Sequence, residues 1–225
     1  MKNRLHTYWW SIVTCAIAVF FLSDFLYATQ GLAYERTATK NIKKNELHEL
    51  PPIHTTHVDK THIYSTLPHD RAGQCHSMLA ETLATVPQDV FPPKLNIELH
   101  IDVPYRGFAN STTIFMNCDL PVHTFNEVFW HELGHIHYHS LKKDLFASGV
   151  KNPFAHGASG TYPHTQDYIT QYATTNEHED FADSFMMYTL YHDTFKTHSS
   201  RSDALNNKYE FIATHFQPLS QLHHR

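Results

Sequence analysis

Two histidines and one glutamate stand at a spacing that could hold a metal ion and move a proton. The order His131-Glu132-x-x-His135 puts the imidazoles four residues apart, and residues four apart on a helix share one face. Both rings can therefore reach the same ion. Glu132 would stand beside that ion, where it could take a proton from a bound water. The pattern predicts a hydrolytic zinc site.

The His-Glu-x-x-His motif could occur by chance, because the chain has 21 histidines among 225 residues. The residue frequencies give roughly 0.08 chance matches in a chain of this length. The surroundings strengthen the signal, since residues 124–140 are predicted to form a largely apolar helix with Thr124 as its N-cap. Buried imidazoles would be costly without a partner. The alternative is an ordinary amphipathic helix in a histidine-rich protein.

A third protein ligand is required, with a fourth position left open for water. Residues 172–185 offer one, as a turn followed by Asn176 as N-cap and a helix that extends to about Tyr191. Glu179 and Asp183 share a face of this helix. Glu179 can bind the metal, and Asp183 can accept a hydrogen bond from the free nitrogen of a ligand histidine. The alternative is an acidic face in solvent, which the apolar residues of this helix disfavour.

With these motifs the chain resembles the gluzincin metallopeptidases, in which His-Glu-x-x-His is followed by Glu-x-x-x-Asp. The finer pattern Tyr-x-x-Thr-Asn-x-x-Glu-x-Phe-Ala-(Glu/Asp) looks more like the catalytic domain of anthrax lethal factor and the Pro-Pro endopeptidases. Here the pattern is made by Tyr172, Thr175, Asn176, Glu179, Phe181, Ala182 and Asp183. The resemblance is specific over residues 128–188. Lethal factor has Glu where this chain has Asp183, and the shorter acid must lie closer to its partner.

The resemblance implies a zinc ion held by His131, His135 and Glu179. It implies that Glu132 is the general base and that Tyr172 supports the oxyanion of the tetrahedral intermediate. The fold it implies is α+β and zincin-like. A small mixed sheet precedes an active-site helix carrying the motif, and the C-terminal half is mainly helical.

The expected function is therefore that of an exported zinc endopeptidase acting on a peptide or protein substrate, with Glu132 activating a zinc-bound water. The formal net charge of −5 argues against nucleic acid as a partner. The alternative is a non-catalytic, histidine-rich zinc-binding protein of the periplasm or the extracellular space. One tightly bound zinc ion would favour the peptidase, and several weakly bound ions would favour storage.

Residues 1–33 predict a signal peptide or an N-terminal membrane anchor. Lys2 and Arg4 precede an apolar run over residues 9–22, and small residues allow cleavage after Ala33 or Ala28. Cleavage would give a secreted or periplasmic protein. The alternative is a membrane-anchored protein, in which the segment is retained. Contact with a membrane is expected only in that case.

Residues 34–68 are predicted to be a polar linker, and residues 69–225 the zinc metallopeptidase domain. Within that domain we expect a helix over 69–86, strands over 94–103 and 110–117, a long loop over 141–171 and a final helix over 203–216. By resemblance, residues 107–115 would form the sheet edge that pairs with an extended substrate.

Two cysteines follow the predicted cleavage site, Cys75 and Cys118. Their even number and the expected export favour a disulfide between them. The alternative is a pair of buried free thiols.

Overall fold

The computed structural model describes residues 48–49, 61–65, 67, 69–148, 151–155, 165–217 and 219. The predicted signal peptide or anchor, residues 1–33, lies outside this range, as does most of the predicted linker. The helices and strands of the described residues belong to one unit of the chain, residues 47–102 and 106–225. Among the described residues, no helix combines the length and apolarity that a membrane span requires.

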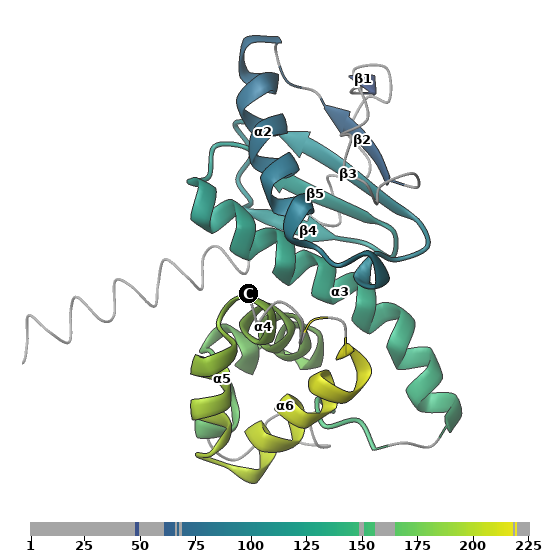
Figure 1. The fold of residues 1–225 in the computed structure, drawn as a ribbon, viewed down its shortest axis with the longest axis vertical. Coiled ribbons are helices and arrows are strands. Elements are labelled where there is room, and N and C mark those ends of the chain that lie inside the picture. The colour runs from purple at the N-terminus through teal and green to yellow at the C-terminus, as the bar shows by residue number, and fades with distance from the viewer. Residues whose placement is uncertain are drawn as a thin grey trace, which may run out of the picture. The chain divides into compact units, whose positions relative to one another are not determined.

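The fold is α+β, with a small mixed sheet and a mostly helical C-terminal half, as the sequence predicted (Figure 1). The strands follow the order β1-β2-β3-β5-β4. The central pairs β2–β3 and β3–β5 are parallel, whereas β1 and β4 pair antiparallel at the two edges. The strands are β1 (His48–Glu49), β2 (Thr61–Ser65), β3 (Leu95–His100), β4 (Gly107–Ala109) and β5 (Thr113–Asn117).

Strand β2 lies inside residues 34–68, the segment predicted to be a polar linker. It pairs with β3 over its whole length, and Ile63 and Ser65 are buried. The segment Thr-His-Ile-Tyr-Ser is short and only one residue in it is aliphatic. Its strand character therefore comes from the neighbouring strand rather than from its own alternation.

The two predicted strands are both shorter than expected. β3 ends at His100, and Asp102 adopts a left-handed conformation with φ 54°. The strand predicted over 110–117 begins at Thr113, because Asn110 turns the chain back towards β4. The Asn110 side chain accepts hydrogen bonds from the backbone N–H groups of Thr112 and Thr113, at 3.0 and 2.9 Å.

Five helices surround or follow the sheet in the described part of the chain. They are α2 (His69–Thr85), α3 (Val122–Ser148), α4 (Glu177–Leu190), α5 (His192–Ser199) and α6 (Asp203–His215). The predicted helices over 69–86 and 203–216 are confirmed within one residue at each end. Helix α5 was not predicted.

The long loop predicted over 141–171 is wrong in its first part, because α3 continues to Ser148. Residues 141–147 contain no glycine or proline that would end a helix, and Leu145 is buried. The remaining connection contains the short 3₁₀ helices η3 (Thr165–Asp167) and η4 (Tyr172–Thr174). These two turns lead the chain into α4.

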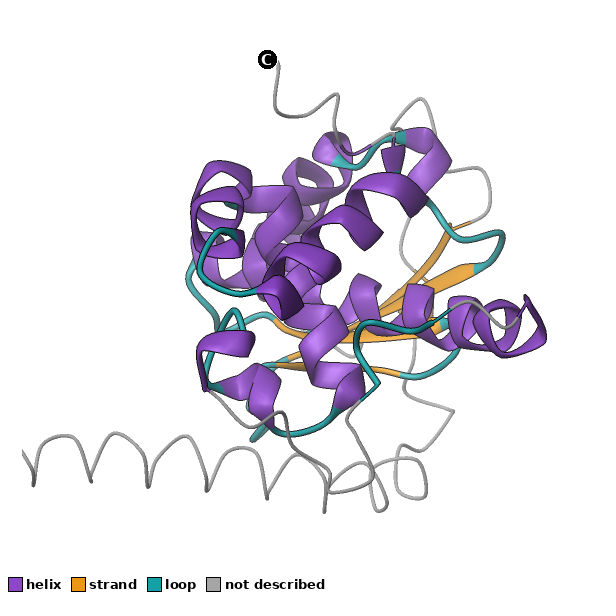
Figure 2. Ribbon diagram, turned by 90° about the horizontal axis from the view of Figure 1, so that it is seen from below, coloured by secondary structure: helices purple, strands orange, loops and turns teal. Residues whose placement is uncertain are grey.

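The core joins the sheet to α2 and α3. One face of β3, made by Leu95, Ile97 and Leu99, is at most 1% exposed. The apolar side chains of α2, including Met78, Leu79 and Leu83, are buried in the same cluster as Phe125 and Phe129 of α3. Figure 2 shows the strands gathered into a single sheet with helices beside it. Helix α3 thus packs on the sheet with one side and is free to meet α4 with another.

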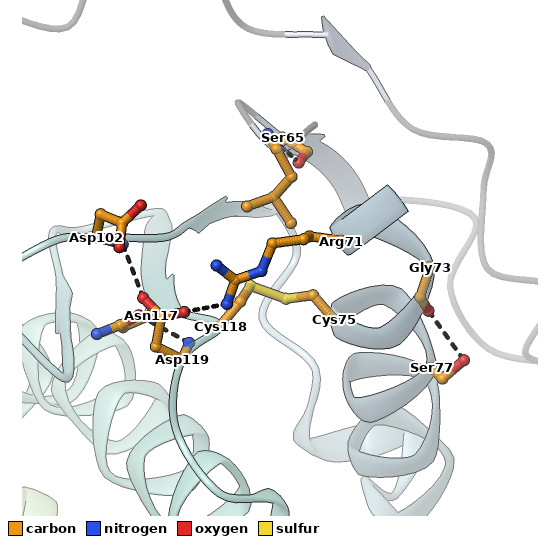
Figure 3. The surroundings of a disulfide bond; sticks show 10 residues. Ser65, Arg71, Gly73, Cys75, Ser77, Asp102, Asn117, Cys118 and Asp119 are labelled. Carbon is orange, nitrogen blue, oxygen red and sulfur yellow. Dashed lines mark hydrogen bonds and ion pairs between the residues drawn. A yellow bond between two sulfur atoms is a disulfide. The ribbon is translucent and has the colours of Figure 1, made fainter. Parts of the chain in front are cut away.

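The predicted disulfide between Cys75 and Cys118 is present, with Cα atoms 5.5 Å apart (Figure 3). It ties α2 to the junction between β5 and α3. Asp119, next in the chain, accepts hydrogen bonds from Arg71 at 2.5 Å and from the backbone N–H of Asp102 at 2.8 Å. Closing a loop of 43 residues contributes about 4 kcal/mol in the chain-entropy account. These three contacts therefore fix the segment that leads into α3.

Candidate metal centre

Helices α3 and α4 approach each other closely at Gly134 and Ala182. A Cβ atom added to Gly134 would lie 3.0 Å from the Ala182 Cα and 3.3 Å from its carbonyl oxygen. Any larger residue at position 134 would have to push the helices apart. The glycine inside the His-Glu-x-x-His motif thus lets the second helix come within reach of the two histidines.

Three donor atoms from the two helices meet at this approach. The Nε2 atoms of His131 and His135 are 3.1 Å apart. The Oε2 atom of Glu179 lies 3.1 Å from the His131 Nε2 and 3.2 Å from the His135 Nε2. Within the described residues, this is the one group of three or more His, Cys, Asp and Glu side chains that could hold a metal ion. The three ligands predicted from the sequence are therefore brought together.

The spacing of these atoms suits zinc. Ligand atoms held about 2.0–2.1 Å from a tetrahedral zinc ion would stand roughly 3.3 Å from one another, close to the separations of 3.1–3.2 Å found here. The two ring nitrogens also face each other, which requires a proton or a cation between them. Three protein donors, rather than four, fit a catalytic zinc site better than a closed structural one.

The charges of this group are strongly coupled. Burial opposes ionisation of Glu179, but hydrogen bonds from His131 and His135 hold the pKa of Glu179 well below its usual range. Burial likewise lowers the pKa of His131, but hydrogen bonds to Asp183 and Glu179 outweigh it and raise that pKa well above the usual value. The lowered pKa favours the negative charge of Glu179, and the raised pKa favours a positive charge on the His131 ring that faces it.

Asp183 contacts the ring nitrogen of His131 that does not face the other donors. Its Oδ1 atom lies 2.7 Å from the Nδ1 atom of His131, and the residue is 4% exposed. The shorter acid reaches the ring because the helices pack closely at Gly134. A carboxylate only accepts hydrogen bonds, so the Nδ1 atom must carry a proton. Loss of the second ring proton would then free the Nε2 lone pair for a bound cation.

Glu132 is 5% exposed and lies between α3 and the edge strand β4. A Cβ atom added to Gly107 of β4 would stand 3.2 Å from the Glu132 Oε1 and 2.4 Å from the Val128 side chain. Only glycine lets the edge strand pass so close to the helix. The Glu132 carboxylate is thus held against the backbone of β4. Glu132 directly follows the donor His131 in the sequence.

Tyr172 lies on η4 and is the most exposed of the predicted site residues, at 42%. Its ring centroid is 5.8 Å from that of His131. Burial of the hydroxyl and the charges of Glu179 and Glu132 raise the pKa of Tyr172 well above its usual value. The phenol therefore keeps its proton and can act as a hydrogen-bond donor.

Asn176 caps α4, as predicted. Its side-chain oxygen accepts hydrogen bonds from the backbone N–H groups of His178 at 2.8 Å and Glu179 at 3.1 Å. The cap determines where α4 begins. It thereby determines the helical face on which Glu179 and Asp183 stand.

Two features near the site were not predicted from the sequence. Lys208 of α6 is fully buried and bonds Asp180 and the carbonyl of Asp167, both at 2.7 Å. Thr170 donates a hydrogen bond to Asp183. A lysine among the apolar residues Leu205, Tyr209 and Ile212 of the last helix was the available signal for the first feature. No local signal marked Thr170.

No family model, curated protein or solved structure matches the chain. The chemistry of the site therefore has to be inferred from its own residues.

Proposed function

We propose that the protein is an exported zinc-dependent endopeptidase with a zincin-like catalytic domain of the gluzincin type. The observation that carries the proposal is the convergence of the His131, His135 and Glu179 donor atoms, all within 3.2 Å of one another. A disulfide between Cys75 and Cys118 is typical of an oxidising compartment and supports export.

Each residue of the site has a part in this chemistry. A bound zinc ion would supply a Lewis acid and lower the pKa of a water at its open position. Glu132 would accept a proton as water attacks the peptide carbonyl and would deliver it to the leaving amine. The protonated hydroxyl of Tyr172 would donate to the carbonyl oxygen as negative charge develops on it. Asp183 would keep His131 in the tautomer that binds the ion.

Strand β4 could align the substrate. The bonds from Asn117 N–H to the Arg106 carbonyl at 3.0 Å and from Asn110 N–H to the Thr113 carbonyl at 2.9 Å identify the pairs that bond inwards. The alternation of an antiparallel ladder then turns the backbone groups of Gly107 and Ala109 outwards. β4 is the last strand at this end of the described sheet. An extended peptide paired with it would pass beside Glu132.

A zinc store is the rival function suggested by the histidine content. A store has no use for a buried carboxylate such as Glu132 beside a site with three ligands. The described part of the chain contains one convergent group, not several. We therefore expect one tightly bound zinc ion for each chain.

The test is cleavage of a diverse peptide library by the protein loaded with one equivalent of zinc. Glu132→Gln should bind zinc as wild type does but abolish cleavage. Glu127→Gln is the matched control, because this residue lies on the same helix and bonds the Tyr191 hydroxyl instead. Tyr172→Phe should reduce turnover less than Glu132→Gln does. Appreciable cleavage by Glu132→Gln would refute the mechanism, and several weakly bound zinc ions would favour storage.

A further inference from the structure

The hydroxyl of Thr170 lies between the Tyr172 turn and the acid behind the metal group. It accepts a hydrogen bond from the backbone N–H of Ala173 at 3.0 Å. It also donates a hydrogen bond to the Oδ2 atom of Asp183. Ala173 is the residue after Tyr172 in η4. One side chain thus joins the turn that carries the candidate oxyanion donor to helix α4.

The direction of each hydrogen bond in this chain is determined. The Ala173 N–H can only donate, so the Thr170 oxygen accepts and the hydroxyl proton is left for the carboxylate. Asp183 receives that proton on Oδ2 and the His131 Nδ1–H on Oδ1, at 2.7 Å. Both carboxylate oxygens therefore have a specific partner on opposite sides. With Oδ2 held in this way, the carboxylate cannot rotate away from the imidazole.

We propose that Thr170 is a positioning residue of the metal site, which acts through Asp183 on the orientation of His131. The same hydroxyl holds the turn that places Tyr172 beside the His131 ring. The inference rests on the proposed function only in naming zinc as the ion. Groups that hydrogen-bond a metal ligand directly, as Asp183 would, typically change metal affinity or activity by about 10–100-fold. Thr170 stands one contact further out, so we expect an effect at the lower end of that range.

The test compares three substitutions in the full chain. Thr170→Val keeps the shape of the side chain and removes both hydrogen bonds, whereas Thr170→Ser keeps the hydroxyl. Thr174→Val is the matched control, because the Thr174 hydroxyl lies on the same turn but donates to the Gln171 carbonyl, at 2.8 Å. Zinc dissociation constants are measured by competition with a chelating dye. Thr170→Ala replaces Thr170→Val if the second does not fold, as judged by circular dichroism in chelator.

We expect Thr170→Val to weaken zinc binding about tenfold, because it acts through Asp183. Thr170→Ser and Thr174→Val should stay within about threefold of wild type. In an Asp183→Ala background, Thr170→Val should add no further loss, because the effect passes through that carboxylate. In the peptidase assay, Thr170→Val should lower kcat and leave KM unchanged.

Two results would overturn the inference. One is an unchanged zinc dissociation constant for Thr170→Val, and the other is a full additional loss in the Asp183→Ala background. Failure of the proposed function would differ from both. A wild-type chain that binds zinc but cleaves no peptide would remove the peptidase and still allow the affinity test of Thr170. A wild-type chain that binds no zinc would overturn both proposals.

Discussion

Helices α3 and α4 carry polar groups on two sides, and the two sides satisfy them differently. On the site side, the side chains of His131, His135 and Glu179 are 13%, 18% and 14% exposed, and their donor atoms point at one another. On the other side of α4, Asp180 is fully buried and bonds the fully buried Lys208 of α6. In the first group, the Nε2 atoms of the two imidazoles face each other. The second is paired within the chain.

The difference separates a ligand site from a structural support. A buried charge with an opposite charge at 2.7 Å needs nothing from outside, although burial raises the pKa of Asp180 to about 7 against the influence of Lys208. Two imidazole nitrogens 3.1 Å apart remain incomplete until a proton or a cation joins them. We call the side of Asp180 and Lys208 the sealed side. Changes there should alter stability, and changes on the site side should alter ligand binding.

The largest expected effect is on the sealed side. Lys208→Met should lower the free energy of unfolding by about 3–5 kcal/mol, because it leaves Asp180 buried without its charge partner. Urea unfolding in chelator measures the loss. Lys196→Met, an exposed lysine on α5, is the control and should change stability by less than about 0.5 kcal/mol. A loss below about 1 kcal/mol for Lys208→Met would contradict the structural role.

Zinc should produce the next effect, on the site side. Free zinc at about a hundred times its dissociation constant should stabilise the protein by about 2.7 kcal/mol. His135→Ala should abolish this gain while leaving the stability in chelator nearly unchanged. Urea unfolding with and without zinc measures both quantities. Equal stabilisation of His135→Ala and wild type would show that the ion binds elsewhere.

A smaller effect is expected from His137, a partly buried residue of α3 whose ring contacts Phe185 and Phe216. Burial lowers the pKa of His137 to about 4, against a backbone hydrogen bond with Val90 that raises it. The neutral form is therefore favoured in the folded state. Stability is complete above the unfolded pKa near 6.5 and is lost as the pH falls towards 4. Between pH 8 and pH 5 the loss should be about 2 kcal/mol.

The His137 prediction is tested by measuring unfolding at both pH values for wild type and His137→Phe. The phenylalanine would pack between Phe185 and Phe216, whose ring centroids lie 5.3 and 5.1 Å from that of His137. The variant should lose about 2 kcal/mol less than wild type over the same range. Other histidines titrate in both proteins, so the difference isolates this one. Identical losses would show that His137 ionises freely in the folded state.

The smallest change in stability is expected where the two sides meet. Gly134→Ala should gain about 1 kcal/mol from helix propensity but lose about 1–3 kcal/mol from overpacking against Ala182, a net loss near 1 kcal/mol. Gly73→Ala is the matched control, because a Cβ there meets nothing within 4 Å, and it should be stabilising. Gly134→Ala should also weaken zinc binding, as measured by dye competition. Tight zinc binding in that variant would show that the close helix approach is not needed.

The parts of the fold that were predicted depend on contacts within a few residues. The N-cap at Asn176 bonds the second and third residues after it, and the spacing from His131 to His135 places both on one helical face. The stripe of α2 follows the same period. Such features need no information from distant parts of the chain. The disulfide was predicted from the number of cysteines and the expected compartment, not from geometry.

The parts that were missed depend on distant partners. Strand β2 has too little alternation to be recognised without β3 beside it. The buried charge of Lys208 is explained only by Asp180 and Asp167, which lie on other elements of the fold. Thr170 acquires its role from Asp183, 13 residues later in the chain.

The sequence by itself determined which residues could hold a metal, because helical periodicity places His131 and His135 on one face. Only the tertiary structure decided that Glu179, 48 residues after His131, joins them and that Asp183 supports the ring from behind. The physical reason is the close packing of α3 on α4 at Gly134 and Ala182. Each helix presents its own donors by local geometry, but the distance between donors on different helices depends on how closely the two backbones can approach.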